Sequence, residues 1–325
     1  MMIVLAAVMF VCLFIGTVNI FTQAGWEEVR TLLHLRLPRI LAAAAVGAAL
    51  AVCGVVLQGL LRNPLADPFI LGISGGGTVG VVVAVAAGFE FAAFGFSTTN
   101  VCAFIGALGA LALVLSFAKA RAGFSTHIII LTGVVLNAIF SAVILFTMSV
   151  MSATDMHQVY QWLMGSLIYA RTLGYAQIAA GAALITVGSL LLLRFARGLN
   201  LFATGEESAV QMGVNVERTK VAVLVLCAVL AGVAVSITGP IGFVGLIVPH
   251  ILRLIVGPDH RILLPASFFG GAIFLVLADT IARSILPLTG LSLSELPVGV
   301  VTAMCGGPFF LWLLRARSRR AIFGN

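Results

Sequence analysis

The chain has 325 residues, of which 61% are hydrophobic and only 9% are charged, and its mean hydropathy is +1.19. A soluble domain carries about 25% charged residues, so the composition excludes a soluble protein and indicates one embedded in lipid. The formal net charge of +7 does not point to nucleic acid, because most basic residues lie in short loops between apolar segments, where they orient a membrane protein.

Apolar stretches recur from end to end, each about the 20 residues that cross a bilayer as a helix. Alternating barrel strands are absent, so we expect an all-α polytopic membrane protein with a single transmembrane domain over residues 1–325. No basic region precedes the first stretch, which favours a span over a signal peptide. The ten expected spans are 2–22, 38–60, 69–88, 100–118, 126–150, 174–195, 220–238, 241–255, 262–286 and 296–314.

Basic residues flank the start of the second span. Arg36 and Arg39 lie on either side of Pro38. They are either anchors that snorkel to the membrane surface or a docking site for an acidic partner, and the sequence leaves both interpretations open.

The loop after the second span contains Pro64 and Pro68, four residues apart. Proline stops one helix and prevents a smooth start of the next. A rigid turn at this position is either a gate at the inner mouth or a simple connector. The third span then carries Gly72, Gly76 and Gly80, a spacing typical of close packing against a neighbouring helix.

The most polar part of the chain is the loop 196–219, between the sixth and seventh spans. It is charged, contains several glycines and lacks an apolar run. We expect it to be a cytoplasmic docking surface for a soluble partner.

The eighth span, 241–255, is short and has Pro249 in its middle. The 196–219 loop and the basic C-terminal tail are both expected in the cytoplasm, so an even number of crossings must separate them. The short segment must therefore cross as a broken or half-length helix, covered by protein or lining a cavity. Ten spans place both termini in the cytoplasm, with thirteen of the eighteen Lys and Arg residues inside.

Few residues of the spans are ionisable. Asp279 and Arg283 lie four apart in the ninth span, so they share a helix face and are expected to pair. The five cysteines lie in apolar spans without metal-ligand spacing, and we expect no metal, no cofactor and no catalytic residue. Neither Lys119 nor Lys220 lies in a phosphate-binding loop, so we expect no ATP hydrolysis by this chain.

Several long blocks of sequence resemble the FecCD family, the permease subunits of ABC importers for iron–siderophores, haem and cobalamin. They are RLPRILAAAAVGAALAVCGVVLQGLLRNPLADPFILGISGGG, GEESAVQMGV, GPIGFVGLIVPHILRLIVGPDHRILLP, LADTIAR and ELPVGVVTAMCGGPFFLWLL. The resemblance covers nearly the whole chain in order. It implies the type II ABC importer permease fold, with ten spans, in the bacterial inner membrane.

The resemblance also implies partners and functional residues. The partners are an ABC ATPase, a periplasmic or lipid-anchored substrate-binding protein and a second permease, most simply an identical copy. Nucleic acid is not among them, and membrane lipid surrounds the chain. By matching motifs the cytoplasmic gate is Asn63, Leu65, Thr126 and His127; the ATPase coupling loop contains Gly205, Glu206, Ala209 and Gly213; the binding protein docks on Arg36, Arg39 and Arg283; and the translocation pathway is lined by Thr132, Asn137, Ser141 and Thr147.

Two functional hypotheses follow. The first is an ABC import permease that moves a metal chelate inward, an iron–siderophore or haem, with cobalamin as the alternative. The second is a carrier driven by an ion gradient, which predicts several intramembrane carboxylates and inverted repeats. The docking loop is present and the carboxylates are nearly absent, which favours the first.

Overall fold

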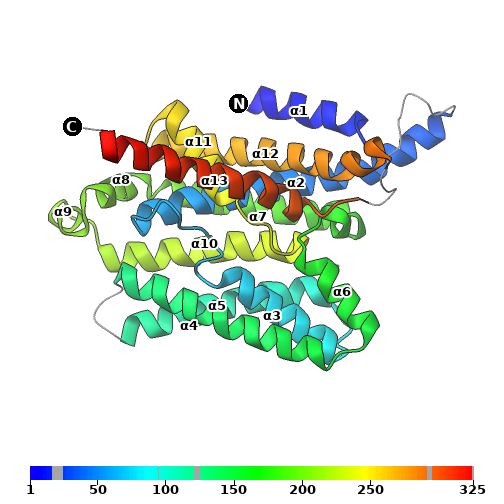
Figure 1. Ribbon diagram of the computed structural model, residues 1–325, viewed down its shortest axis with the longest axis horizontal. Helices are drawn as coiled ribbons and strands as arrows, with labels where there is room; N and C mark the ends of the chain where they lie inside the picture. Colours follow the sequence, from blue (N-terminus) through cyan, green and yellow to red (C-terminus); the bar gives the residue numbers. More distant parts are fainter. Residues whose placement is uncertain (17–24, 94, 121–124, 291–294, 324–325) are drawn as a thin grey trace.

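The structure is a computed structural model that describes residues 1–16, 25–93, 95–120, 125–290 and 295–323. It is a bundle of helices with one two-stranded hairpin (Figure 1). The elements are α1 (Met2–Phe14), α2 (Trp26–Leu60), α3 (Ile73–Ala86), β1 (Ala92–Ala93), β2 (Phe96–Ser97), α4 (Thr98–Ala120), α5 (Thr126–Ser149), α6 (Ala153–Leu163), a 3-10 helix (Leu167–Thr172), α7 (Tyr175–Leu193), α8 (Ala196–Thr204), α9 (Glu206–Gln211), α10 (Val216–Thr238), α11 (Val244–Val256), α12 (His260–Thr289) and α13 (Val298–Phe323). In the hairpin, Ala92 pairs with Ser97 and Ala93 with Phe96.

The expected all-α membrane fold is confirmed, and each of the ten expected spans has a helix. Among the described residues, six helices are long and apolar enough to cross a membrane: α2, α4, α5, α7, α10 and α12. Four shorter apolar helices, α1, α3, α11 and α13, correspond to the other expected spans. Helix α11 contains Pro249 and has 13 residues, so it is only about 20 Å long. This length agrees with the predicted half-length span.

Several boundaries differ from the expected ones. Helix α2 begins at Trp26, twelve residues before Pro38. The proline therefore lies inside the helix, where it removes one backbone hydrogen bond but does not end the helix. Helix α3 begins only at Ile73, after Gly72 at φ 77°. Helix α1 ends at Phe14, and most of the remainder of its expected span lies outside the described residues.

Helix α2 is the centre of the bundle. It packs against α7, α10, α11 and α12. Of its most apolar 18-residue stretch, 89% is buried inside the protein, compared with 22% of the corresponding stretch of α5. Two of its contacts are close backbone crossings: a Cβ at Gly47 would lie 2.2 Å from the carbonyl oxygen of Gly271, and one at Gly54 would lie 1.9 Å from that of Gly245. Only glycine permits these approaches.

The glycines of the third span also pack as expected. A Cβ at Gly76 would lie 2.5 Å from the carbonyl oxygen of Gly106 on α4, and one at Gly80 would lie 2.1 Å from that of Cys102. Gly72 serves differently, as the left-handed residue before α3. The pairing of α3 with α4 therefore rests on two of the three glycines.

A buried ion pair joins α2 to α12 near one end of the bundle. Arg39 donates from Nε and Nη2 to Asp279 Oδ1 at 2.9 and 2.7 Å, and its Nη1 donates to Glu295. Arg39 and Asp279 are each 1% exposed. The expectation that Asp279 pairs with Arg283 is corrected by this geometry: the arginine of the neighbouring helix α2 reaches both carboxylate oxygens, which a residue four positions along the same helix does not.

Replacing Arg39 with Met should strongly destabilise the protein. The change removes the side chain that donates to both Asp279 and Glu295, and breaking a buried ion pair costs about 3–5 kcal/mol. Thermal unfolding in detergent measures the effect. Arg30→Met, on the exposed surface of the same helix, is the matched control, and equal unfolding temperatures for the two variants would contradict the role given to Arg39.

Candidate functional site

The segment between α7 and α10 forms a pair of short helices that project from the bundle (Figure 1). Gly205, at φ 129°, separates α8 from α9, and Gly213, at φ 83°, follows α9. Phe202 and Ala209 are fully buried and anchor the pair, whereas Val210 and Met212 are 57% and 62% exposed. The expected docking loop is thus a folded pair of helices that exposes Val210 and Met212 beside the polar side chains of Glu207 and Gln211.

One carboxylate ties this projection to the bundle. Glu206, the first residue of α9, accepts hydrogen bonds at Oε1 from Lys220 Nζ at 2.7 Å and from Thr126 Oγ1 at 3.1 Å. Lys220 lies on α10 and is 1% exposed, and Thr126 is the first residue of α5. The structure therefore brings together one residue expected in the coupling loop and one expected in the gate.

Sequence reasoning assigned no structural role to Lys220. Lys220 lies four residues after the start of α10, where the chain becomes apolar. A lysine at the start of a span needs a partner within the protein, and this position was the sequence signal for its role.

The turn between α2 and α3 is held by its own side chains. Asn63 Oδ1 accepts the N–H of Leu65 at 2.9 Å, and Asp67 Oδ1 accepts the N–H groups of Phe69 and Ile70 at 3.1 and 3.2 Å. Leu65 is 46% exposed. Such side-chain bonds to the backbone two residues on make a rigid turn.

Asp67 in this turn is buried, and burial raises the pKa of its carboxyl to about 6 from 3.8, although the two backbone hydrogen bonds act in the opposite direction. Sequence reasoning did not single out Asp67.

The expected gate residues lie at two places. Asn63 and Leu65 belong to the turn just described, whereas Thr126 and His127 begin α5. The His127 side chain is exposed. Among the described residues, no hydrogen bond or ion pair joins the two places.

The expected pathway residues lie along α5, and most of their polar atoms bond within the protein. Ser141 and Thr147 donate to the carbonyl oxygens four residues earlier, and Asn137 donates to that of Phe69 at 2.7 Å. Thr132 is half-buried. Hydroxyls satisfied by their own helix present little polarity to a passing solute.

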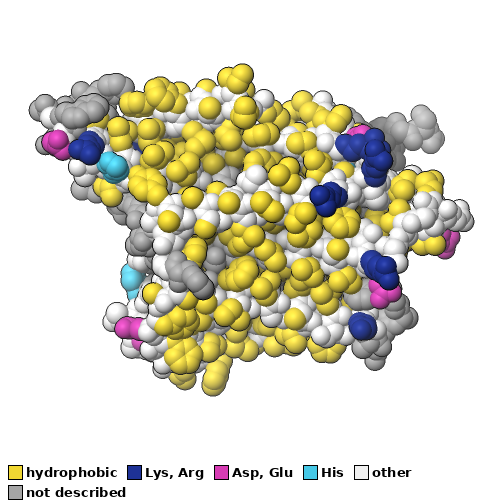
Figure 2. Space-filling view, turned by 180° about the vertical axis from the view of Figure 1, so that it is seen from behind, with side chains coloured by type: hydrophobic (Ala, Val, Ile, Leu, Met, Phe, Trp, Pro, Cys, Tyr) yellow, Lys and Arg dark blue, Asp and Glu magenta, His cyan; other side chains and the backbone are white. Residues whose placement is uncertain are grey.

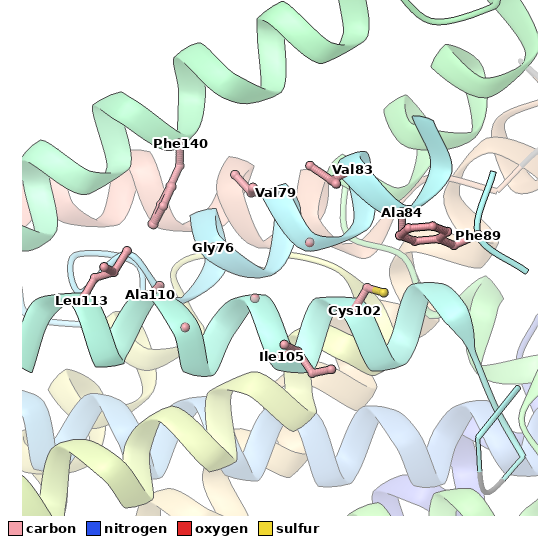
Figure 3. Close-up of a pocket in the computed structure, with 13 residues that line it drawn as sticks. Gly76, Val79, Val83, Ala84, Phe89, Cys102, Ile105, Ala110, Leu113 and Phe140 are labelled. Atoms are coloured by element: carbon pink, nitrogen blue, oxygen red, sulfur yellow. The ribbon is translucent and has the colours of Figure 1, made fainter. Parts of the chain in front are cut away.

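An apolar groove of about 360 Å³ lies where α3, α4 and α5 meet (Figure 3). Phe140 of α5 points into it from one side, and Val79, Val83 and Ile105 line the others. The groove is lined by apolar side chains and the thiol of Cys102, and none of its lining side chains is charged.

The three arginines expected to dock a partner are all buried. Arg36, Arg39 and Arg283 are 6%, 1% and 2% exposed. Arg36 Nη1 donates to the carbonyl oxygen of Leu13 at 3.0 Å, and Arg283 Nη2 donates to that of Cys12. These are the last carbonyls of α1, which lack partners within their helix, so both arginines cap its C-terminal end.

Charged and apolar side chains are separated over the surface. In Figure 2, Lys and Arg gather at the end of the molecule that carries α8 and α9, and hydrophobic side chains cover the belt between the two ends. This distribution is typical of a membrane protein whose basic loops lie on one side.

Comparison with known proteins gives a consistent result. Residues 4–316 match the FecCD transport family. The chain is 44% identical over 288 residues to the cobalamin import system permease protein BtuC of Halobacterium salinarum, covering 89% of this chain and 74% of that protein. It is 40% identical over 291 residues to the hemin transport system permease protein HmuU of Yersinia pestis, covering 89% and 84%.

Two further proteins are similar to this chain. The Fe(3+) dicitrate transport system permease protein FecD of Escherichia coli is 39% identical over 292 residues, covering 90% of this chain and 87% of that protein. A solved structure described as an inward-facing conformation of a metal-chelate type ABC transporter superposes with a TM-score of 0.82 at 32% identity, covering 97% and 96% of the two chains.

Replacing Lys220 with Met should loosen the α8–α9 pair without unfolding the bundle. Met fills the buried space of the lysine stem but gives Glu206 no cation. Hydrogen exchange of the amides over 200–213 should speed up several-fold while that of α2 stays unchanged. Lys119→Met, at the exposed end of α4, is the control, and unchanged exchange over the loop would contradict the anchoring role.

Asp67→Asn should change how stability depends on pH. Because the folded pKa lies above the unfolded one, the free energy of unfolding falls as the pH rises from about 4 to about 6 and is level above that. Asn keeps the acceptor oxygen and never ionises, so the variant should be the more stable at pH 7.5, by at most about 3 kcal/mol, and the two should converge near pH 4. Thermal unfolding at both pH values checks this, with Glu90→Gln as an exposed control. A constant difference across the range would contradict the assignment.

Proposed function

The chain belongs to the FecCD transport family and is a permease of a type II ABC importer, and on that premise we propose that it moves a metal chelate into the cytoplasm, driven by ATP hydrolysis on a separate subunit. In this proposal the chain lies in the cytoplasmic membrane with both termini inside. It catalyses no reaction itself.

The observation that carries the proposal is the anchored projection of α8 and α9. Val210 and Met212 expose apolar side chains on a loop that no lipid covers if it lies in the cytoplasm. Buried Ala209 and the Glu206–Lys220 ion pair hold the loop in position. Exposed apolar side chains on a rigid support suit a protein partner, and the ATPase is the partner that the family supplies.

The same ion-paired carboxylate supports a route from motor to gate. Glu206 contacts Thr126 at the start of α5, so a push on α9 reaches the helix that carries His127 and the expected pathway residues. Asn63 and Leu65 form the second part of the proposed gate, where the rigid turn presents an exposed apolar side chain.

Docking of a substrate-binding protein on Arg36, Arg39 and Arg283 is supported by the resemblance in sequence. Their burial adds a condition: an acidic partner reaches Arg36 and Arg283 only when the C-terminal end of α1 moves off them. Arg283 has capacity for such a partner, since its Nε and Nη1 have no hydrogen-bond partner among the described residues.

A second permease copy is the proposed neighbour of α5. This helix exposes Leu131, Leu145 and Phe146 at 64%, 68% and 72%, and it carries the residues proposed to line the pathway. Pairing two copies through this face would place both sets around one central passage, with lipid covering the remaining apolar belt.

The proposed cargo is an iron–siderophore or haem, with cobalamin as the alternative. The relatives with printed names carry cobalamin, hemin and ferric dicitrate, which are all bulky metal chelates. Titration of the cognate binding protein with ferric siderophores, haem and cobalamin identifies the cargo, and binding of none of them would reject all three proposed cargoes.

A carrier driven by an ion gradient is the alternative from another class. Its proton or ion site would require a carboxylate free to titrate within a span. Asp279, which the sequence places in a span, is held by Arg39 at 2.7 Å, and this pairing favours the ABC importer.

Met212→Glu should prevent assembly with the ATPase. The substitution puts a charge in the centre of an apolar contact, and the loss of one such anchor costs about 2 kcal/mol or more, or at least tenfold in affinity. Co-purification of the two subunits measures it. Met156→Glu, on α6 at the other end of the molecule (Figure 1), is the control, and equal recovery of the ATPase with both variants would argue against the docking role.

A further inference from the structure

Helix α8 lies where it can connect the α8–α9 projection to the second part of the proposed gate. Glu206 of α9 contacts Thr126 at the start of α5, but that contact does not reach the turn that carries Asn63 and Leu65. Helix α8 packs against α2 and α12, and the turn follows directly after α2. A connection from α8 through these two helices would therefore reach the turn.

Asn200 of α8 is fastened to the start of α12. Its Nδ2 donates to Asp259 Oδ1 at 2.7 Å, and its Oδ1 accepts the backbone N–H of His260 at 3.0 Å. The same Oδ1 lies 2.7 Å from His260 Nδ1. Asp259 is the N-cap of α12 and also accepts the N–H of Arg261 at 3.0 Å. All three contacts of the Asn200 side chain thus join α8 to the first turn of α12.

These contacts fix the orientation of both polar side chains. The carboxylate of Asp259 accepts hydrogen bonds, so the atom of Asn200 that faces it is the amide nitrogen. The other atom, Oδ1, then faces His260 and can only accept, so Nδ1 of His260 carries the proton and donates it. The ring of His260 is therefore held in one position by α8.

The far side of the same ring packs against the last turn of α2. His260 is 5% exposed, and a Cβ at Gly59 would lie 2.5 Å from His260 Nε2 and 3.2 Å from Cε1. Nε2 has no hydrogen-bond partner among the described residues, so this is a packing contact for which glycine leaves the room. Packed protein interiors compress little and transmit displacement, so a movement of the ring toward α2 must move Gly59.

The last turn of α2 is in turn bonded to the gate residues. The backbone N–H of Asn63 donates to the carbonyl oxygen of Gln58 at 3.2 Å, and Asn63 Oδ1 accepts the N–H of Leu65. Pro64 and His260 are among the residues that line a cavity of about 340 Å³, so the turn has open space beside it. A displacement of the end of α2 can therefore shift the turn without displacing packed side chains on that side.

We infer that Asn200 and His260 are positioning residues for transport, which carry a displacement of the α8–α9 projection to the turn after α2. The inference rests on the proposed function, because the ATPase is the source of the displacement. It adds a second connection to the contact between Glu206 and Thr126, so that docking at one projection moves both parts of the gate.

Cysteine accessibility in the assembled complex tests this inference. Leu65→Cys reports on the turn and His127→Cys on the start of α5, in chains that also carry Cys102→Ser and Cys305→Ser, because the other three cysteines are buried. The rate of maleimide labelling is measured in proteoliposomes that contain the permease and its ATPase, with and without ATP. Without further substitutions, ATP should change the rate at both positions.

Two variants interrupt the connection at different points. Asn200→Leu removes the side-chain bonds to α12 and should abolish the ATP-dependent change at position 65 while the change at position 127 is kept. His260→Asn keeps a donor near the place of Nδ1 but lacks the part of the ring that reaches Gly59, so it should have the same effect.

Two further variants serve as comparisons. Thr126→Val removes the hydroxyl that donates to Glu206 and should give the reverse pattern, with the change lost at position 127 and kept at position 65. Thr186→Val removes an exposed hydroxyl that bonds within its own helix α7, and it should retain both changes.

The outcomes separate the inference from the proposed function. If Asn200→Leu lost the change at both positions alike, Asn200 would serve the fold as a whole, and the inference would be overturned. A change kept at position 65 in either Asn200→Leu or His260→Asn would also overturn it, while the proposed function would stand. If ATP changed neither rate in the chain without these substitutions, the proposed function would fail and the inference with it.

Discussion

Buried charge is the constraint on which the rest of this structure depends. A cation in a membrane-embedded bundle must find a partner within the protein. Arg39 finds Asp279 and Glu295, and in doing so it fixes α2 against α12 and against the segment that leads into α13. Arg36 and Arg283 then secure α1 through its terminal carbonyls. Four helices are thus positioned around one arginine-rich cluster.

A second, smaller network of polar side chains lies at the opposite end of the bundle. Lys220 of α10 forms an ion pair with Glu206 of the projecting loop, and Glu206 also accepts a hydrogen bond from Thr126 of α5. Between the two networks the helices meet through glycine crossings and apolar packing, which resist sliding. A rigid bundle with an ion-paired loop at one end is suited to receive a mechanical push, and this is the physical content of the proposed coupling to an ATPase.

Hydropathy was enough to predict the spans, because the bilayer sets their length and the chain obeys it. It did not reveal which charges meet: Arg39 and Asp279 are 240 residues apart, and helix periodicity suggested the local partner, Arg283. Helix α6 was missed although Ser152 and Asp155 form a capping pair at its start, since its apolar content is too low for a span. The resemblance located the coupling loop, but only the structure shows that Lys220 holds it. The burial of Arg36 and Arg283 could likewise not be predicted, because it depends on α1 packing over them.

We propose that this permease works with a separate ATPase and not with an ion gradient. The most direct measurement is uptake of the chelate bound by the cognate binding protein into proteoliposomes that contain the permease and its ATPase. Uptake should occur only when ATP is supplied on the side of the α8–α9 loop, and an imposed proton or sodium gradient should have no effect. Gradient-driven uptake by the permease alone, without ATP, would contradict it.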